Sequence, residues 1–401
     1  MANERFLSIA QELTFGTLPT AGWRRIIALT SSTLALNKDT YQSNAIIGNR
    51  GLTAVRPGND NPTGGLPFEL VVAGLEPFWY NALGSAYSDG ANPSDTGGTT
   101  RTASAASEGD TNILVDATAA AALSPGDLVR IGTIASFDTF LREVSAVDTT
   151  GGSENIDVLF PVPRDVGASE PIFTVDHGAS DVYTHVFKRA VLPRGFSVQH
   201  HFEDITQFFK YSGVKVSSMT LSIPQTGIAT GNLDLRGKTA TRAGTATGGA
   251  LTKPSILPYV SHEGAMEEGG SGFALALSAD ITIDNEMDDT LYVIGSKERH
   301  SLPEGRGTCT GTVSVIFEDE TLADKFRNET ETSLKFTFTN STSSTEIFLP
   351  KVKYTGGAGD PAMESAFGPV RLNNLPFQAT VDTTTTNTDI QVTVISENWL
   401  Y

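Results

Sequence analysis

The stretch Thr63-Gly64-Gly65-Leu66-Pro67-Phe68-Glu69-Leu70 returns as Thr310-Gly311-Thr312-Val313-Ser314-Val315-Ile316-Phe317, 247 positions later. The Thr-Gly pairs coincide and the alternating apolar positions keep their phase. Alternation with period two puts apolar side chains on one face of a β-strand. Residues 214–223 alternate as well, with a slip near Ser218 that suits a β-bulge. These patterns dominate the chain and predict a mainly β fold with an internal repeat.

The repeat extends towards the N-terminus at the same shift, without a gap. Leu34-Ala35-Leu36-Asn37 falls on Ile281-Thr282-Ile283-Asp284. A further similarity, at another offset, joins Lys210-Tyr211-Ser212-Gly213 to Lys353-Tyr354-Thr355-Gly356. Gly- and Thr-rich β segments can match by chance, but identities and apolar phase agree here, and so do the places of the predicted helices. We therefore predict a duplicated domain.

Helical patterns are rare and fall at corresponding places in the two copies. One helix is predicted over 76–83, because Pro77 suits its first turn and Gly84 follows its end. A second is predicted over 319–328, where acids come first and bases last, as the helix dipole favours.

The change of offset between the copies indicates an insertion in the first one. Its short apolar runs and turn residues predict a small β-barrel or sandwich. The expected division is an N-terminal arm (1–30), a discontinuous first copy (31–96 and 182–241), the inserted β domain (97–181), a Gly-rich linker (242–272) and the second copy (273–401).

The composition excludes several classes of protein. Lys and Arg number 28 and Asp and Glu 46, for a net charge of −18. Such acidity argues against a protein that grips nucleic acid or an anionic membrane surface. The single cysteine, Cys309, excludes an intrachain disulfide and a Cys-based zinc site. The sequence shows neither a signal-peptide pattern nor an apolar run of transmembrane length, so we expect synthesis in a cytoplasm and no membrane partner.

Several short motifs, in their order along the chain, resemble the major tail tube proteins of long, non-contractile-tailed bacteriophages. The resemblance covers both copies but not the insertion, and it is carried by Phe15-Gly16-Thr17-Leu18-Pro19 before Trp23, Ser32-Thr33-Leu34-Ala35-Leu36-Asn37-Lys38-Asp39-Thr40, Phe209-Lys210-Tyr211-Ser212-Gly213-Val214-Lys215-Val216-Ser217-Ser218-Met219, Ile281-Thr282-Ile283-Asp284-Asn285, Leu302-Pro303-Glu304-Gly305-Arg306 and Leu349-Pro350-Lys351-Val352-Lys353-Tyr354.

The resemblance implies two tandem tail-tube β-sandwich domains, each with a short flanking helix. It implies a structural virion protein, made in the host cytoplasm, whose stacked rings form a hollow tail tube that conducts DNA from capsid to host cell. Duplication favours rings of three chains, a pseudo-hexamer, over rings of six. The implied partners are other copies of the chain, a tape-measure protein in the lumen, tail terminator and tail-tip proteins, and double-stranded DNA that passes without specific binding.

Assembly of this kind needs surface contacts and no catalytic site or cofactor. Residues 38–62 and 286–309 are long connections between strands and suit stacking arms. The N-terminal arm carries apolar residues that either dock on another subunit or cover their own core. The candidate interface residues are Phe6, Leu7, Leu13, Phe15, Arg50, Arg56, Lys297, Arg299 and Arg306.

Two other functions stay open at this point: a carbohydrate-binding or fibre-type β protein of a virion or cell surface, and a β-rich hydrolase. Neither a nucleophile elbow nor a phosphate-binding loop is present. The cluster of His200, His201 and Glu203 and the acidic run 284–289 fit no strong metal motif. We therefore predict that the chain is not an enzyme and holds no metal.

Overall fold

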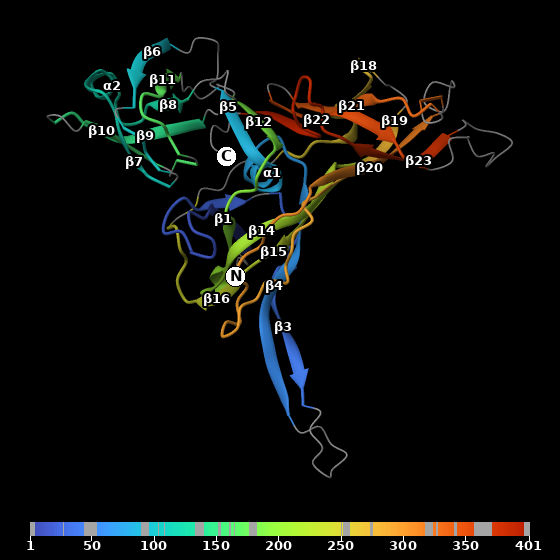
Figure 1. Cartoon of the computed structure of the whole chain (residues 1–401), viewed down its shortest axis with the longest axis horizontal. Coiled ribbons are helices and arrows are strands. Elements are labelled where there is room, and N and C mark those ends of the chain that lie inside the picture. The colour runs from blue at the N-terminus through green and yellow to red at the C-terminus, as the bar shows by residue number, and fades with distance from the viewer. Residues whose placement is uncertain are drawn as a thin grey trace.

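The computed structural model describes residues 5–26, 28–43, 54–89, 96–102, 104–107, 109–132, 140–150, 154–159, 162–163, 165–175, 183–249, 251, 257–272, 276–316, 324–325, 328–340, 343–356 and 371–396. The fold is mainly β, as predicted, with an 18-stranded and a 6-stranded sheet. In Figure 1 the inserted strands lie at one end of the molecule and the C-terminal strands at the other, with the N-terminal strands between them.

Along the sequence, some strands of the first copy precede the insertion and the others follow it. They are β1 (Arg5–Gln11), β2 (Arg24–Ile26), β3 (Ala35–Gln42), β4 (Val55–Glu69), β13 (Phe196–Phe202), β14 (Gln207–Ile223), β15 (Thr230–Arg236) and β16 (Thr239–Ala243), with helix α1 (Glu76–Leu83) after β4. The second copy contains β17 (Gly264–Glu268), β18 (Ser271–Gly272), β19 (Ala276–Asp284), β20 (Thr308–Ile316), β21 (Thr332–Asn340), β22 (Ser343–Tyr354), β23 (Arg371–Ala379) and β24 (Gln391–Ser396).

The two copies correspond strand by strand, including the register of pairing. In the hairpin of β3 and β4, Ala35 lies opposite Thr63; in that of β19 and β20, Thr282 lies opposite Thr310, again 247 positions later. The antiparallel ladders give the remaining matches as β1 with β17 (shift 259), β2 with β18 (247), β13 with β21 (136), β14 with β22 (138), β15 with β23 (142) and β16 with β24 (150).

One sequence similarity is not a structural correspondence. By the shift of 138, Val216 of β14 corresponds to Tyr354 of β22. The residues that lie opposite them, on β15 and β23, correspond to each other as well. The predicted match of Tyr211 with Tyr354 is therefore wrong by five residues. The predicted slip near Ser218 is confirmed, since the ladder of β14 and β15 shifts between Val216 and Ser218.

Helix α1 has the predicted bounds. Pro77 lies in its first turn, and Gly84 ends it with a left-handed backbone (φ 96°) that favours glycine. The Trp79 and Phe78 side chains are buried in a single apolar cluster shared by both copies. Most of the second predicted helix lies outside the described residues, although Asp324 and Lys325 within it are helical.

The N-terminal segment and the predicted linker both contain paired strands. Strand β1 pairs along its whole length with β13, and its Leu7 and Ile9 side chains are buried. Strands β17 and β18 lie within residues 242–272, where β17 pairs with β21 as β1 pairs with β13. The division into domains stays a prediction, but these strands place both segments inside the sheet.

The insertion forms the smaller sheet and carries its own apolar cluster. It contains β6 (Thr96–Arg101), β7 (Asn112–Leu114), α2 (Ala117–Ala122), β8 (Leu128–Ile131), β9 (Phe140–Asp148), β10 (Asn155–Val158) and β11 (Pro171–Val175). Its two flanking strands, β5 (Gly84–Asp89) and β12 (Tyr183–Arg189), pair with each other, and β12 also pairs with β24. The insertion is thus attached to the edge of the second copy's sheet.

The repeated Thr-Gly pair has a steric explanation. A Cβ added at Gly64 would lie 2.4 Å from the Cα of Leu34, and one at Gly311 would lie 2.2 Å from the carbonyl oxygen of Asp280. We expect Gly64→Ala or Gly311→Ala to lower the free energy of unfolding by about 1–3 kcal/mol, because backbone must move. Urea denaturation measures this. Gly244→Ala, with no atom within 4 Å of the added Cβ, is the control, and equal midpoints for all three variants would contradict the steric account.

Candidate assembly surfaces

The two copies are joined edge to edge within one chain. Strand β14 of the first copy pairs with β19 of the second, from Ser218 opposite Asp284 to Ile223 opposite Ala279. Because β19 corresponds to β3, this joint connects two different edges of the repeated unit. It is therefore a head-to-tail contact of the kind that can repeat from unit to unit.

The loop 285–307 fastens the second copy to the first. The Arg299 guanidinium is 1% exposed and donates to the carbonyl oxygens of Gly237 (2.6 Å) and Asp289 (2.8 Å), and also to the Asn61 side chain. The Tyr292 hydroxyl donates to the Asp60 carbonyl oxygen at 3.1 Å. This loop holds the two copies in a fixed arrangement.

A second set of polar contacts between the copies involves strand β12, which follows the insertion. The Arg189 side chain of β12 contacts Asp389 with Nε–Oδ1 and Nε–Oδ2 distances of 2.8 and 2.9 Å, and it donates to Asn285 Oδ1 and to the Thr308 carbonyl oxygen. The Asn285 side-chain amide in turn donates to the carbonyls of Ala82 and Val216. These largely buried polar groups connect strand β12, helix α1 and both copies.

One long edge of β3 is open in the part of the chain that the structure describes, where β3 pairs only with β4. The Pro62 carbonyl oxygen accepts from Gly237 on the far side of β4, so Leu36, opposite Pro62, forms a non-hydrogen-bonded pair with it. The N–H and C=O of Leu36 therefore point to the open edge. In β19 the corresponding residue, Ile283, faces β14.

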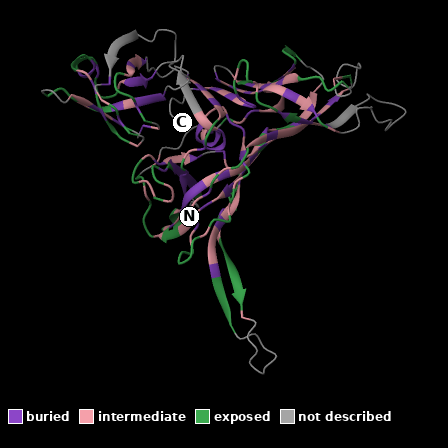
Figure 2. Cartoon of the chain, in the orientation of Figure 1, coloured by how far each residue is buried: buried purple, intermediate pink, exposed green. Residues whose placement is uncertain are grey.

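The hairpin of β3 and β4 projects from the body, and its outer part is exposed (Figures 1 and 2). Tyr41 and Val55 remain 58% and 56% exposed there. A Lys38–Asp60 ion pair of 2.9 Å marks the base of the projection. A projecting two-stranded hairpin has little stability alone and gains it when it packs on something else.

The predicted interface residues divide into exposed and internally packed groups. Arg56, Lys297 and Arg306 are exposed, and Leu13 is 39% exposed beside Gly109 of the insertion. Leu7 and Arg299 are buried inside the chain, whereas Phe6 and Phe15 are half-buried. Phe6 stacks on His201, and Phe15 has Lys238 Nζ 5.6 Å from its ring centroid. Arg50 lies outside the described residues, and an interface role stays a prediction for all nine.

The histidine pair packs into the first copy. The His201 ring stacks on Phe6 with centroids 4.0 Å apart, and its Nε2 lies 2.8 Å from the Ser8 hydroxyl. The pKa of both His200 and His201 is lowered to about 4, mainly by burial, and for His201 the positive charge of nearby Arg25 contributes to the lowering. Both rings are therefore neutral at pH 7 and serve as packing groups.

This burial predicts a loss of stability in acid. Unfolded histidine titrates near 6.5, so below that pH the unfolded chain binds more protons and the free energy of unfolding falls. We expect His201→Gln to lose about 1–2 kcal/mol less between pH 7 and pH 5 than the unsubstituted chain. Urea denaturation at the two pH values tests this, and parallel losses would contradict it.

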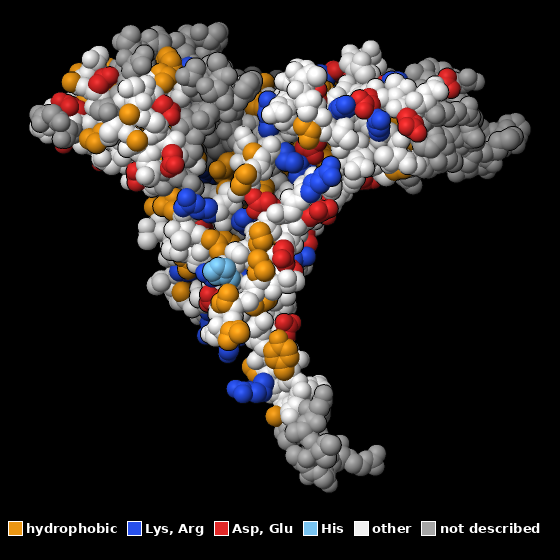
Figure 3. Space-filling view, viewed as in Figure 1, with side chains coloured by type: hydrophobic (Ala, Val, Ile, Leu, Met, Phe, Trp, Pro, Cys, Tyr) orange, Lys and Arg blue, Asp and Glu red, His pale blue; other side chains and the backbone are white. Residues whose placement is uncertain are grey.

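No group of three or more His, Cys, Asp or Glu side chains suited to a metal ion occurs among the described residues. No helix in the described part of the chain is long and apolar enough to cross a membrane. On the face shown in Figure 3, acidic and basic side chains are interspersed over both copies. The candidate assembly surfaces of the described chain are therefore sheet edges: those of β14 and β19, which are joined within the chain, and that of β3, which is open.

A search of curated proteins finds no match. The family model described as phage tail tube protein matches residues 2–381, nearly the whole chain, so the chain belongs to the phage tail tube protein family.

Proposed function

We propose that this chain polymerises with copies of itself into stacked rings that form the hollow tail tube of a bacteriophage and conduct double-stranded DNA from capsid to host cell. Membership of the family makes it a structural component of the virion tail. The observation that carries the finer proposal is the joint of β14 and β19, since the same contact can be repeated at the open edge of β3. Repetition around a closed circle satisfies every such edge.

We infer rings of three chains, each supplying two corresponding halves, so that six units surround the lumen. The strand-by-strand match of the copies supports this number. The projecting hairpin of β3 and β4, with Arg56 on it, is proposed to contact the next ring, and exposed Lys297 and Arg306 are proposed to lie at the same ring-to-ring contact. A tape-measure protein, terminator and tail-tip proteins are the further partners proposed, and no catalytic step is assigned.

Electron microscopy of the concentrated, purified chain tests the proposal. We expect tubes or rings with three inserted domains in each ring. Six insertions in each ring would contradict the trimer. Particles that stay monomeric at every concentration but bind glycans would overturn the tube in favour of a carbohydrate-binding protein.

A further inference from the structure

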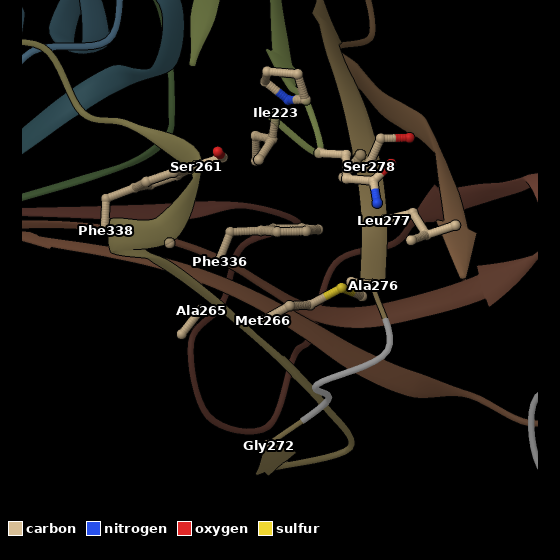
Figure 4. Close-up of a pocket in the computed structure, with 14 residues that line it drawn as sticks. Ile223, Ser261, Ala265, Met266, Gly272, Ala276, Leu277, Ser278, Phe336 and Phe338 are labelled. Atoms are coloured by element: carbon tan, nitrogen blue, oxygen red, sulfur yellow. The ribbon is translucent and has the colours of Figure 1, made fainter. Parts of the chain in front are cut away.

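Two cavities lie at corresponding places in the two copies. The cavity of the second copy, about 500 Å³, lies between β17, β21 and the start of β19 (Figure 4). The cavity of the first copy, about 580 Å³, lies between β1, β13 and the segment before β3. The strand shifts given above relate their walls: residues 276–279 fall on 29–32, Gly272 on Arg25, and Phe336 on His200.

The second-copy cavity has one wall that the other lacks. Ile223, Pro224 and Gln225, at the end of β14, line it although they belong to the first copy. In Figure 4 Ile223 lies on the side of the Phe336 ring opposite Met266. All residues that line the first-copy cavity come from the first copy itself, and none corresponds to these three. That wall is missing in the described part of the chain.

We propose that the first-copy cavity and the adjoining open edge of β3 form one docking surface for a second copy of this chain, whose residues after Gly356 take the place that Ile223–Gln225 take in the second-copy cavity. The proposal rests on the proposed self-assembly and names the lateral contact. By the shift of 138, Tyr354 at the end of β22 corresponds to Val216 of β14, and counting on along the sequence brings positions 361–363 to Ile223–Gln225. The pairing of β14 with β19 inside the chain thus gives the geometry of the proposed contact between chains.

The chemistry of the first-copy cavity differs from that of its counterpart. Arg5 and Arg25 stand where the second copy has Gly264 and Gly272, and the Arg25 guanidinium lies 4.0 Å from the Phe6 ring centroid. In the sequence, residues 357–370 carry Asp360 and Glu364 and neither Lys nor Arg. An acidic segment therefore suits the cationic cavity, and this complementarity selects the second half of a neighbouring chain as occupant.

The shifts also fix the register of the contact. Ser218 opposite Asp284 becomes Gly356 of one chain opposite Asn37 of the next. In the joint inside the chain, Asn285 N–H donates to the Ser217 carbonyl oxygen, so Ser218 and Asp284 form a non-hydrogen-bonded pair, about 4.5 Å between Cα atoms. A disulfide spans such a separation. The native Cys309 does not compete, because burial raises the pKa of its thiol to about 12.

The first experiment mixes two singly substituted chains, Asn37→Cys and Gly356→Cys, lets them assemble and oxidises them. From an equal mixture we expect disulfide-linked pairs of one variant with the other in close to half of the chains, which is the limit for random assembly, and few pairs of identical variants. The doubly substituted chain Ser218→Cys with Asp284→Cys is the control, since its link forms within one chain.

The second experiment fills the cavity. Ser31 is exposed in its wall, and we expect Ser31→Trp to slow polymerisation at least tenfold without changing the melting temperature. Ser124→Trp, at an exposed turn of the insertion, should polymerise normally. Tubes that form without the cross-link and at normal rate in Ser31→Trp would overturn the docking surface and leave the proposed function standing. Absence of tubes from the unsubstituted chain would overturn both.

Discussion

Replacing Leu36 by proline is expected to abolish polymerisation while leaving the monomer folded. The Leu36 N–H points to the open edge of β3, so its loss breaks no bond of the hairpin with β4. Proline cannot donate a hydrogen bond and its ring blocks the approach of another strand. If copies join at this edge, the variant cannot close a ring. Light scattering and electron microscopy measure polymer, and circular dichroism reports whether the monomer is folded.

Two controls separate the edge from the side chain. Leu36→Ala loses the half-buried side chain but keeps the N–H, and should still polymerise. Ile283→Pro makes the equivalent change in β19, where the edge is already paired with β14, and should destabilise the monomer itself. Normal tubes from Leu36→Pro would show that β3 takes no part in assembly.

Removing the Arg299 side chain is expected to cost about 2–5 kcal/mol of the free energy of unfolding, since each buried acceptor left without its donor costs about 1–3 kcal/mol. The guanidinium is almost fully buried, and its loss leaves the Gly237 carbonyl and the Asn61 side chain without their donor. It also removes the Arg299 ion pair to Asp289, which lies at 3.5 Å. Urea denaturation of Arg299→Ala measures this loss directly.

The matched control is Arg306→Ala, in the same loop but exposed. A surface substitution of this kind changes stability by about 0.5 kcal/mol or less. Equal unfolding midpoints for the two variants would contradict the role of Arg299 as the fastening between the copies. Arg299 was predicted as an interface residue from its charge and its loop. A large loss of stability in Arg299→Ala would show that its positive charge serves the contact between the two copies within one chain.

Local patterns predicted much of the fold. The alternation in Leu66-Pro67-Phe68-Glu69-Leu70 gave a strand because every second side chain must reach the core, and Leu66 and Phe68 are buried. Helix α1 followed from Pro77 and Gly84, whose backbone preferences act over a few residues. The Thr-Gly match at Gly64 and Gly311 was visible because two backbones approach each other at the same point in both copies.

Contacts between distant segments could not be predicted in this way. The pairing of β14 with β19 depends on which edges meet, and no local pattern encodes that choice. Arg189 and Asp389 are 200 positions apart, and neither stands out among the charged residues of the sequence. Strand β17 lies in a Gly-rich stretch that was predicted to be a linker. The signal that could have revealed it is its position before the second copy, which matches the position of β1 before the first copy.

The covalent joint of the copies changes the kinetics of building a ring. The contact of β14 with β19 forms during folding, at the high effective concentration that a tether provides, and needs no collision between molecules. In the proposed ring of three, only half of the lateral contacts then depend on how much protein the cell has made. Tethering thus lowers the threshold concentration for growth, and because each molecule carries two unlike docking ends, growth intermediates can add the next molecule in a single orientation only.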